Sequence, residues 1–146
     1  MKRTLKNDKW KKKLTLEQYD VMRCSATEKP FTGKLLYNKK KGVYFCSACG
    51  NELFSSDTKF DSGTGWPSFY DFKKGSIKMK KDFSMIISRT EVTCAKCGSH
   101  LGHVFNDGPK PTGKTKGKAF SVSLAGSGKR YCINSVALNF KEKNKL

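Results

Sequence analysis

Several features that define whole classes of protein are missing from this 146-residue sequence. No apolar run approaches the ~20 residues of a membrane span, which excludes an integral membrane protein. No heptad pattern, glycine period or repeat of about 20 to 50 residues is present, so coiled coils, collagen and repeat arrays are excluded as well. The basic residues 1–6 lead into no apolar segment, so we expect no secretory signal and a cytoplasmic location, or an organelle if a targeting segment has been removed.

Acidic residues are also scarce. The 12 Asp and Glu stand against 30 Lys and Arg, which gives a formal net charge of +18 at pH 7 and raises nucleic acid as a partner. The cations are spread along the whole chain, however, and nearly all are Lys. Arg, which suits bidentate phosphate or base contacts, occurs only as Arg3, Arg23, Arg89 and Arg130. We therefore favour a solvated lysine-rich surface over specific nucleic-acid recognition.

Four of the six cysteines form two pairs with identical spacing, Cys46-x-x-Cys49 and Cys94-x-x-Cys97, each followed directly by Gly. Two intervening residues let both sulfur atoms face one point from a tight turn, and the Gly supplies the positive φ that such a turn needs. A redox-active CxxC or a pair of disulfides is the competing interpretation. A thioredoxin-type motif lies between a strand and a helix, whereas strand-like sequence flanks both pairs here. The spacing predicts one structural Zn²⁺ held by the four thiolates.

Cys24 and Cys132 lie outside these pairs, and each is either a small buried hydrophobe or a reactive thiol. The neighbours of Cys24 favour neither. Residues 129–138 are typical of a strand, whose period of two places Arg130, Cys132 and Asn134 on one face. A guanidinium beside a thiol favours the thiolate, and an amide adds a hydrogen-bond donor for a substrate. This polar face would be costly in a core, so we predict that Cys132 is catalytic.

The remaining pattern is that of a mainly antiparallel β domain. Residues 1–13 are expected to be a basic arm, and residues 15–18 form a capping-box pattern at which a short helix begins. The segment 29–33, with its Pro and Gly, ends that helix. Short β-forming runs between turn residues follow, without a second long helix: 35–37, 43–45, 84–88, 91–93, 119–124 and 131–140.

Two further segments have the composition of binding sites. Residues 60–69 collect glycines, a proline and aromatics around Trp66, which is either a buried indole in a structural turn or an aromatic wall of a small-ligand pocket. His100 and His103 would be redundant as metal ligands beside four cysteines, which favours acid–base or substrate-binding roles. On a regular strand they would face opposite sides, so they converge only if Gly102 lets the backbone depart from β geometry.

The sequence combines these motifs in one order: the first CxxC pair, Phe60-Asp61-Ser62-Gly63-x-Gly65-Trp66-Pro67-Ser68-Phe69, the second CxxC pair, His100-Leu101-Gly102-His103-Val104-Phe105, Asp107-Gly108-Pro109 and Arg130-Tyr131-Cys132-Ile133-Asn134-Ser135. Together they resemble the type B methionine-R-sulfoxide reductases. The resemblance spans residues 14–140, a single reductase domain followed by a basic tail, 141–146. It implies a compact β domain of two antiparallel sheets with a short N-terminal helix, in which the zinc lies away from the active site.

The resemblance also implies the chemistry of the site. Cys132 is the nucleophile that attacks the sulfur of methionine R-sulfoxide and becomes a sulfenic acid. His103, with His100, orients the sulfoxide oxygen and helps its protonation, and Trp66 packs on the ε-methyl group of the substrate.

Three more residues take supporting roles by resemblance: Arg130 and Asp107 tune the thiolate and its hydrogen bonds, and Asn134 holds bound polar atoms in place. The expected partners are oxidised proteins or peptides, and thioredoxin or another thiol reductant. We expect a monomer, with no specific nucleic acid and no membrane as partners.

The chain departs from the family pattern at two places. The resolving cysteine usually lies between the glycines of the Trp66 segment, where this chain has Thr64. Because a hydroxyl cannot form a disulfide, Cys24 is the predicted resolving residue, and direct reduction by an external thiol is the alternative. Residues 114–128 are inserted before the catalytic strand, as a β-hairpin or as a displaced strand with an extra loop, and could shape access for protein-bound substrates.

Two functions of other classes stay open. A basic zinc-ribbon module would bind nucleic acid, but it gives no reason for Trp66, His103 and Cys132 to occur together. A purely structural or chaperone-like zinc protein would show neither turnover nor specific binding.

Overall fold

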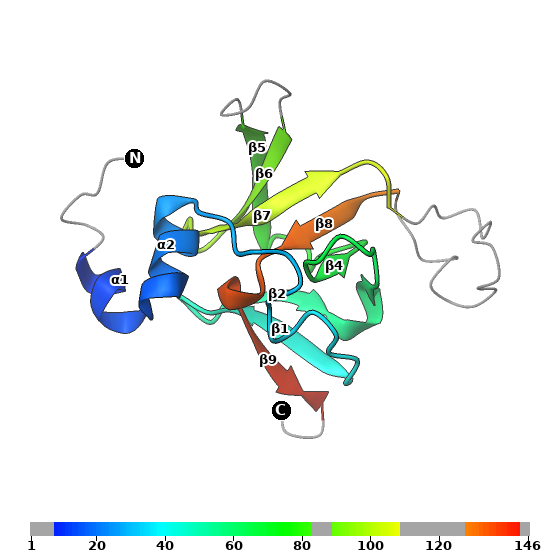
Figure 1. The fold of residues 1–146 in the computed structure, drawn as a ribbon, viewed down its shortest axis with the longest axis horizontal. Coiled ribbons are helices and arrows are strands. Elements are labelled where there is room, and N and C mark those ends of the chain that lie inside the picture. The colour runs from blue at the N-terminus through cyan, green and yellow to red at the C-terminus, as the bar shows by residue number, and fades with distance from the viewer. Residues whose placement is uncertain (1–7, 83–88, 109–127, 144–146) are drawn as a thin grey trace.

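Two antiparallel sheets and two short helices make up the computed structural model, which describes residues 8–82, 89–108 and 128–143 (Figure 1). The smaller sheet has the strand order β2-β1-β9, and the larger has the order β3-β4-β8-β7-β6-β5. This architecture confirms the expected mainly β fold. The strands are Gly42–Cys46 (β1), Glu52–Ser55 (β2), Lys59–Phe60 (β3), Ser68–Phe69 (β4), Ile77–Asp82 (β5), Arg89–Cys94 (β6), His100–Phe105 (β7), Arg130–Ile133 (β8) and Leu138–Glu142 (β9).

The N-terminal region is more helical than the sequence predicted. Helix α2, Leu16–Cys24, begins at the expected capping box, in which the Thr15 side chain accepts from the backbone N–H of Gln18. A further helix, α1 (Asp8–Lys13), replaces the second half of the expected arm. Trp10 of α1 packs against the core and so anchors this helix despite its lysines. None of the described helices is long and apolar enough to cross a membrane.

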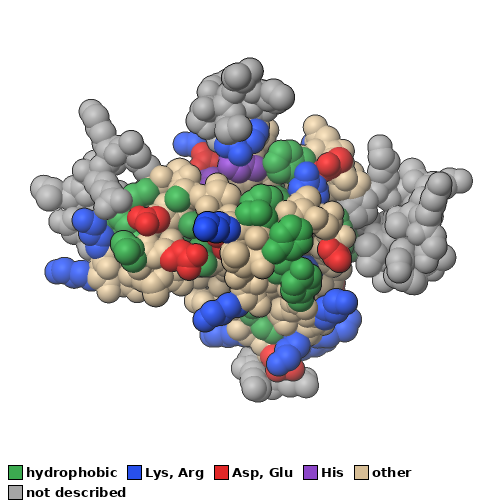
Figure 2. All heavy atoms as spheres, viewed as in Figure 1, with side chains coloured by type: hydrophobic (Ala, Val, Ile, Leu, Met, Phe, Trp, Pro, Cys, Tyr) green, Lys and Arg blue, Asp and Glu red, His purple; other side chains and the backbone are tan. Residues whose placement is uncertain are grey.

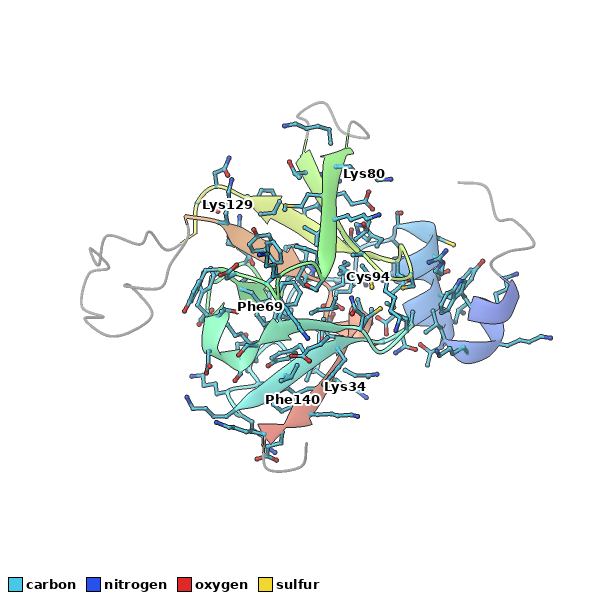
Figure 3. The ribbon with its side chains drawn as sticks, turned by 180° about the vertical axis from the view of Figure 1, so that it is seen from behind. Lys34, Phe69, Lys80, Cys94, Lys129 and Phe140 are labelled. Atoms are coloured by element: carbon cyan, nitrogen blue, oxygen red, sulfur yellow. The ribbon has the colours of Figure 1, made fainter. Side chains whose placement is uncertain are left out.

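Aromatic side chains join the two sheets. Phe69 of β4 lies between them (Figure 3), stacked on Phe54 of β2 with ring centroids 4.3 Å apart and in edge contact with Tyr44 of β1 at 5.1 Å. All three are almost completely buried, and each contributes roughly 1.5–3 kcal/mol by its burial. Because side chains alternate along a strand, the neighbouring Ser68 points to the other face of the larger sheet, where its register partner is Cys132.

Two of the expected strands are different in the structure. Residues 35–37 form a turn, in which Leu36 donates to the carbonyl of Gly33, so the local hydrogen bonds replace a sheet ladder. The single run expected over 131–140 divides into β8 and β9, which lie in different sheets. The short 3₁₀ helix Ser135–Ala137 makes this change of direction.

Other expectations concern the ends and the insertion. The runs at 84–88 and 119–124 lie outside the described residues, as does the 114–128 insertion apart from Gly128. The first residues of the expected basic tail, 141 and 142, belong to β9 and pair with β1.

Candidate active site and metal cluster

Four strands of the larger sheet place a row of polar side chains side by side. Glu91 of β6 is the register partner of His103 on β7, and His103 is the partner of Cys132 on β8. Cys132 in turn faces Ser68 of β4. Directly opposed residues of antiparallel strands project from the same face with Cβ atoms about 4.5–5.5 Å apart. Strand register thus brings an acid, an imidazole and a thiol together from three adjacent strands.

His100 and His103 converge because β7 contains a bulge. The pairing with β6 moves from Gly102 opposite Val92 to His100 opposite Thr93, which leaves Leu101 as the extra residue. The two imidazole rings lie 5.3 Å apart at an angle of 66°. The departure from regular β geometry therefore lies directly beside Gly102. Gly102 also permits close packing of the strands, since a Cβ at this position would overlap the carbonyl oxygen of Cys132.

Glu91 is a site residue that the sequence reasoning missed. Its Oε2 lies 2.6 Å from Nδ1 of His100, whose side chain is 4% exposed. Lys80 of β5 approaches the other carboxylate oxygen at 3.8 Å but is itself largely exposed. The sequence did contain a signal for this residue. Glu is depleted in strands, so a carboxylate inside a β-forming run is unusual and indicates a specific role.

Arg130 and Asp107 form a bidentate ion pair at the end of β8. The Arg130 Nε and Nη2 atoms donate to the two carboxylate oxygens at 2.8 and 3.2 Å, and the guanidinium lies 4.4 Å from the ring centroid of Phe105. Burial lowers the pKa of Arg130, but the hydrogen bond to Asp107 and the electrostatic interaction with Cys132 outweigh it and raise the pKa. The guanidinium thus faces the thiol as well as the carboxylate.

Glu28, also missed from the sequence, connects Trp66 with Asn134. The Trp66 indole donates to the carbonyl oxygen of Glu28 at 3.0 Å, while the backbone N–H of Glu28 donates to Oδ1 of Asn134 at 3.0 Å. The Asn134 amide nitrogen donates to the carbonyl of Leu101. Burial raises the pKa of the Glu28 carboxyl group. The segment after α2 therefore holds the indole and the end of β8 in fixed positions.

Four of the predicted site residues, Trp66, His103, Cys132 and Asn134, line a cavity of about 80 Å³ on the face of the larger sheet that the segment after α2 crosses. His100, Asp107 and Arg130 are not among its lining residues. Cys132, His103 and Trp66 meet there, so Trp66 is a partly exposed wall and not a fully buried indole. Phe105 also lines the cavity. Its spacing of two residues from His103 predicts that both side chains lie on the same face of the strand. The lining consists of Thr27, Trp66, Arg89, Gly102, His103, Phe105, Cys132 and Asn134.

Thr64 contacts this thiol, whereas Cys24 is not among the residues that line the cavity. The hydroxyl of Thr64 is 3.5 Å from Sγ of Cys132 and 2.8 Å from the hydroxyl of Ser62. Cys24 is half-buried against the core at the end of α2, and Thr27, three residues later, lines the cavity. Cys24 and Cys132 are both free thiols in this structure.

The four remaining cysteines form a cluster whose sulfur atoms all lie within 4.8 Å of one another. Cys46 is 3.7 Å from Cys97 and Cys49 is 3.6 Å from Cys94, so the close pairs join the two turns. A tetrahedral centre with metal–sulfur bonds of ~2.3 Å has sulfur–sulfur edges of about 3.8 Å. The donor set therefore fits a tetrahedral metal ion. Burial raises the pKa of the Cys49 thiol to about 11.

The cluster lies between the two sheets and away from the cavity. Cys94 is at the end of β6, near α2 (Figure 3), and Cys46 is at the end of β1. Gly50 and Gly98, which follow the two pairs, have φ values of 79° and 76°. These values confirm the predicted positive φ of the glycines in the two turns. Arg23 of α2 donates to the carbonyl of Cys97 at 2.9 Å and so attaches the helix to the second turn.

Residues 14–142 match the SelR domain. The chain is 59% identical over 135 residues to the peptide methionine sulfoxide reductase MsrB of Methanosarcina barkeri, an alignment that covers 92% of this chain and 84% of the relative. It is 51% identical over 138 residues to the MsrB protein of Leptospira interrogans, covering 94% of each chain. The chloroplastic peptide methionine sulfoxide reductase B1 of Arabidopsis thaliana is 48% identical over 143 residues, which are 97% of this chain and 63% of the relative.

Proposed function

The chain belongs to the SelR domain family of methionine sulfoxide reductases, and we propose that Cys132 is the thiol with which it reduces the R epimer of methionine sulfoxide in oxidised peptides. The observation that carries this proposal is the meeting of Cys132, His103 and Trp66 in one small cavity. A nucleophile, a proton donor and an apolar wall are the groups that reduction of a sulfoxide needs.

The reaction can be written with these side chains. The Cys132 thiolate attacks the sulfinyl sulfur while His103 donates a proton to the sulfinyl oxygen, which makes the sulfur more electrophilic. The attack forms a bond between Sγ of Cys132 and the sulfinyl sulfur. The protonated oxygen then moves from that sulfur to Sγ as the new sulfur–sulfur bond breaks, which leaves Cys132 as a sulfenic acid and releases methionine as the thioether. Arg130, held by Asp107, stabilises the thiolate before attack. Trp66 packs on the methyl group and so selects one epimer.

The test is an assay of the separate R and S epimers of a blocked methionine sulfoxide with dithiothreitol as reductant. Turnover of R alone is the expected result. Turnover of both epimers would remove the selecting role of Trp66, and the absence of turnover by folded, metal-loaded protein would overturn the proposed function.

Glu91 is assigned a positioning role. Its carboxylate accepts a hydrogen bond from Nδ1–H of His100 and thereby orients that ring beside His103. We expect Glu91→Gln to lower kcat about tenfold and Glu91→Ala about 100-fold, with KM little changed, because Gln keeps an acceptor and loses only the charge. Glu52→Gln is the matched control, since Glu52 pairs with Lys73 at the surface. Equal rates for the wild type and Glu91→Ala would contradict the assignment.

Cys24 is the proposed resolving thiol. It would condense with the sulfenic acid of Cys132 to a disulfide and release water, and thioredoxin or another dithiol would reduce that disulfide. Cys24→Ser should leave the first turnover intact, with one methionine released per chain, and lower thioredoxin-dependent steady-state turnover at least about tenfold. An unchanged thioredoxin-dependent rate would show that an external thiol reduces the sulfenic acid directly.

The metal of the four-cysteine cluster is assigned as zinc, which four thiolates bind with tetrahedral geometry and no open position. Cys46, Cys49, Cys94 and Cys97 would hold it, and its contribution is structural. Zinc thiolates and a nucleophilic thiol both require reduced cysteines, which suits a reducing compartment such as the cytoplasm.

A further inference from the structure

Phe31 has a backbone conformation that its side chain does not favour. Its φ is 67°, in the left-handed region where a bulky residue is an outlier and Gly or Asn is the usual choice. The residue follows Pro30 in a turn that is closed by the Thr32 hydroxyl, which donates to the carbonyl of Lys29 at 2.6 Å. The Phe31 residue is nevertheless 58% exposed. Residues with strained backbone conformations concentrate at active sites and binding sites, where the position of the side chain serves function and not stability.

The strained residue lies against the segment that carries Trp66. The backbone N–H of Phe31 donates to the carbonyl of Gly65 at 2.7 Å. A Cβ on Gly65 would come within 2.6 Å of Pro30 and 2.9 Å of the Phe31 ring, so the ring lies directly over this glycine. We call Pro30, Phe31, Gly65 and Trp66 the apolar shelf. Hydrophobic side chains gather on this face of the molecule, over the segment after α2 and over β4 (Figure 2).

The cavity beside the shelf is too small for more than the end of one side chain. Its volume of about 80 Å³ is well below the ~300–1,000 Å³ of pockets that enclose whole ligands. It can hold a sulfinyl group and its methyl, while the backbone and neighbouring residues of a peptide substrate remain on the surface. The side chains of the peptide that neighbour the sulfoxide therefore contact the protein surface at the rim of the cavity. Trp66 belongs to both the cavity lining and the apolar shelf, so the shelf forms part of this rim.

We propose that the apolar shelf binds an apolar side chain next to the oxidised methionine, and that Phe31 is the residue that determines this preference for sequence context. The inference rests on the proposed function, because it takes the cavity as the place of the sulfoxide. The hydrogen bond from the Phe31 N–H to the Gly65 carbonyl and the packing of the ring on Gly65 hold Phe31 in its strained conformation before the peptide binds. This reduces the ordering that binding requires.

The test compares blocked peptides in which the R-sulfoxide is flanked by Leu on its N-terminal side, by Leu on its C-terminal side, or by Gly on both sides. Phe31→Asn removes the ring and suits the left-handed backbone, so its Tm should equal or exceed that of the wild type. Phe31→Leu keeps an apolar side chain and should retain part of the preference. Tyr37→Asn is the matched control, because Tyr37 is 66% exposed and outside the shelf.

We expect the wild type to have a KM about fivefold lower for one Leu-flanked peptide than for the Gly-flanked peptide, the effect of partly burying one aliphatic side chain. Phe31→Asn should lose this difference at unchanged kcat, and Tyr37→Asn should keep it. Equal KM values for all peptides, or a preference that survives in Phe31→Asn, would overturn the inference.

Binding measured without turnover separates the two proposals. Titration calorimetry of Cys132→Ser with the same peptides should show the same preference, and the double variant with Phe31→Asn should lose it. Inactive wild-type protein that still prefers a Leu-flanked peptide would overturn the proposed function alone. Active protein with no preference in either measurement would overturn the shelf alone.

Discussion

Cys132→Ser should lower the rate of methionine R-sulfoxide reduction by more than about 10³-fold. A serine hydroxyl is a far weaker nucleophile than a thiolate at neutral pH, and its oxygen cannot accept the sulfoxide oxygen as a sulfenic acid does. The half-buried Cys132 side chain lies at the cavity and outside the metal cluster, so the fold and the metal content should not change. The measurement is release of methionine from the R epimer with dithiothreitol.

A second readout identifies the oxidised atom. After one turnover without reductant, a 1,3-dione that reacts with sulfenic acids should label Cys24→Ser protein once per chain, at residue 132. Cys132→Ser should take up no label. Full activity of Cys132→Ser, or labelling at another cysteine, would assign the nucleophile elsewhere.

Removal of the metal should have the largest effect on stability. Structural zinc contributes apparent binding free energies of roughly 10–16 kcal/mol in isolated zinc fingers, and here the cluster joins the end of β1 to the end of β6, in different sheets. We expect Cys94→Ser to lose the metal and to lower Tm by more than about 10 °C, or to prevent folding. Calorimetry and elemental analysis of the purified protein measure both effects.

Cys24→Ser is the matched control for the metal, since Cys24 is a half-buried thiol outside the cluster. It should keep one metal ion per chain and a wild-type Tm. A Cys94→Ser protein with wild-type metal content and Tm would show that the four sulfur atoms do not form the binding site.

The high positive charge is weaker evidence for function than the cysteines are. A nucleic-acid-binding module would gain affinity from lysines through phosphate contacts, but it has no use for the row formed by Glu91, His103 and Cys132. Lys80, the register partner of Glu91 on β5, is 73% exposed and lies 3.8 Å from Glu91, so this surface ion pair contributes little to stability.

Local patterns in the sequence determined the features that depend on a few consecutive residues. The two CxxC turns require only their own spacing and a Gly with positive φ, and the helix begins at Thr15 because the cap is made within four residues. Period-two spacing likewise placed Arg130 beside Cys132. The local signal failed over 35–37, where β-forming residues fold into a turn through bonds to their own neighbours.

Only the tertiary structure decided which distant residues meet. Glu91 joins the site because three strands align it with His103 and Cys132, and the two histidines converge because one bulge at Leu101 shifts the pairing with β6. Glu28 contacts Trp66 and Asn134 through its backbone carbonyl and N–H groups. Because every residue has these groups, the residue type at position 28 gives no indication of the contacts. Register, bulges and backbone contacts depend on segments far apart in the chain, and for that reason they leave little trace in the local sequence.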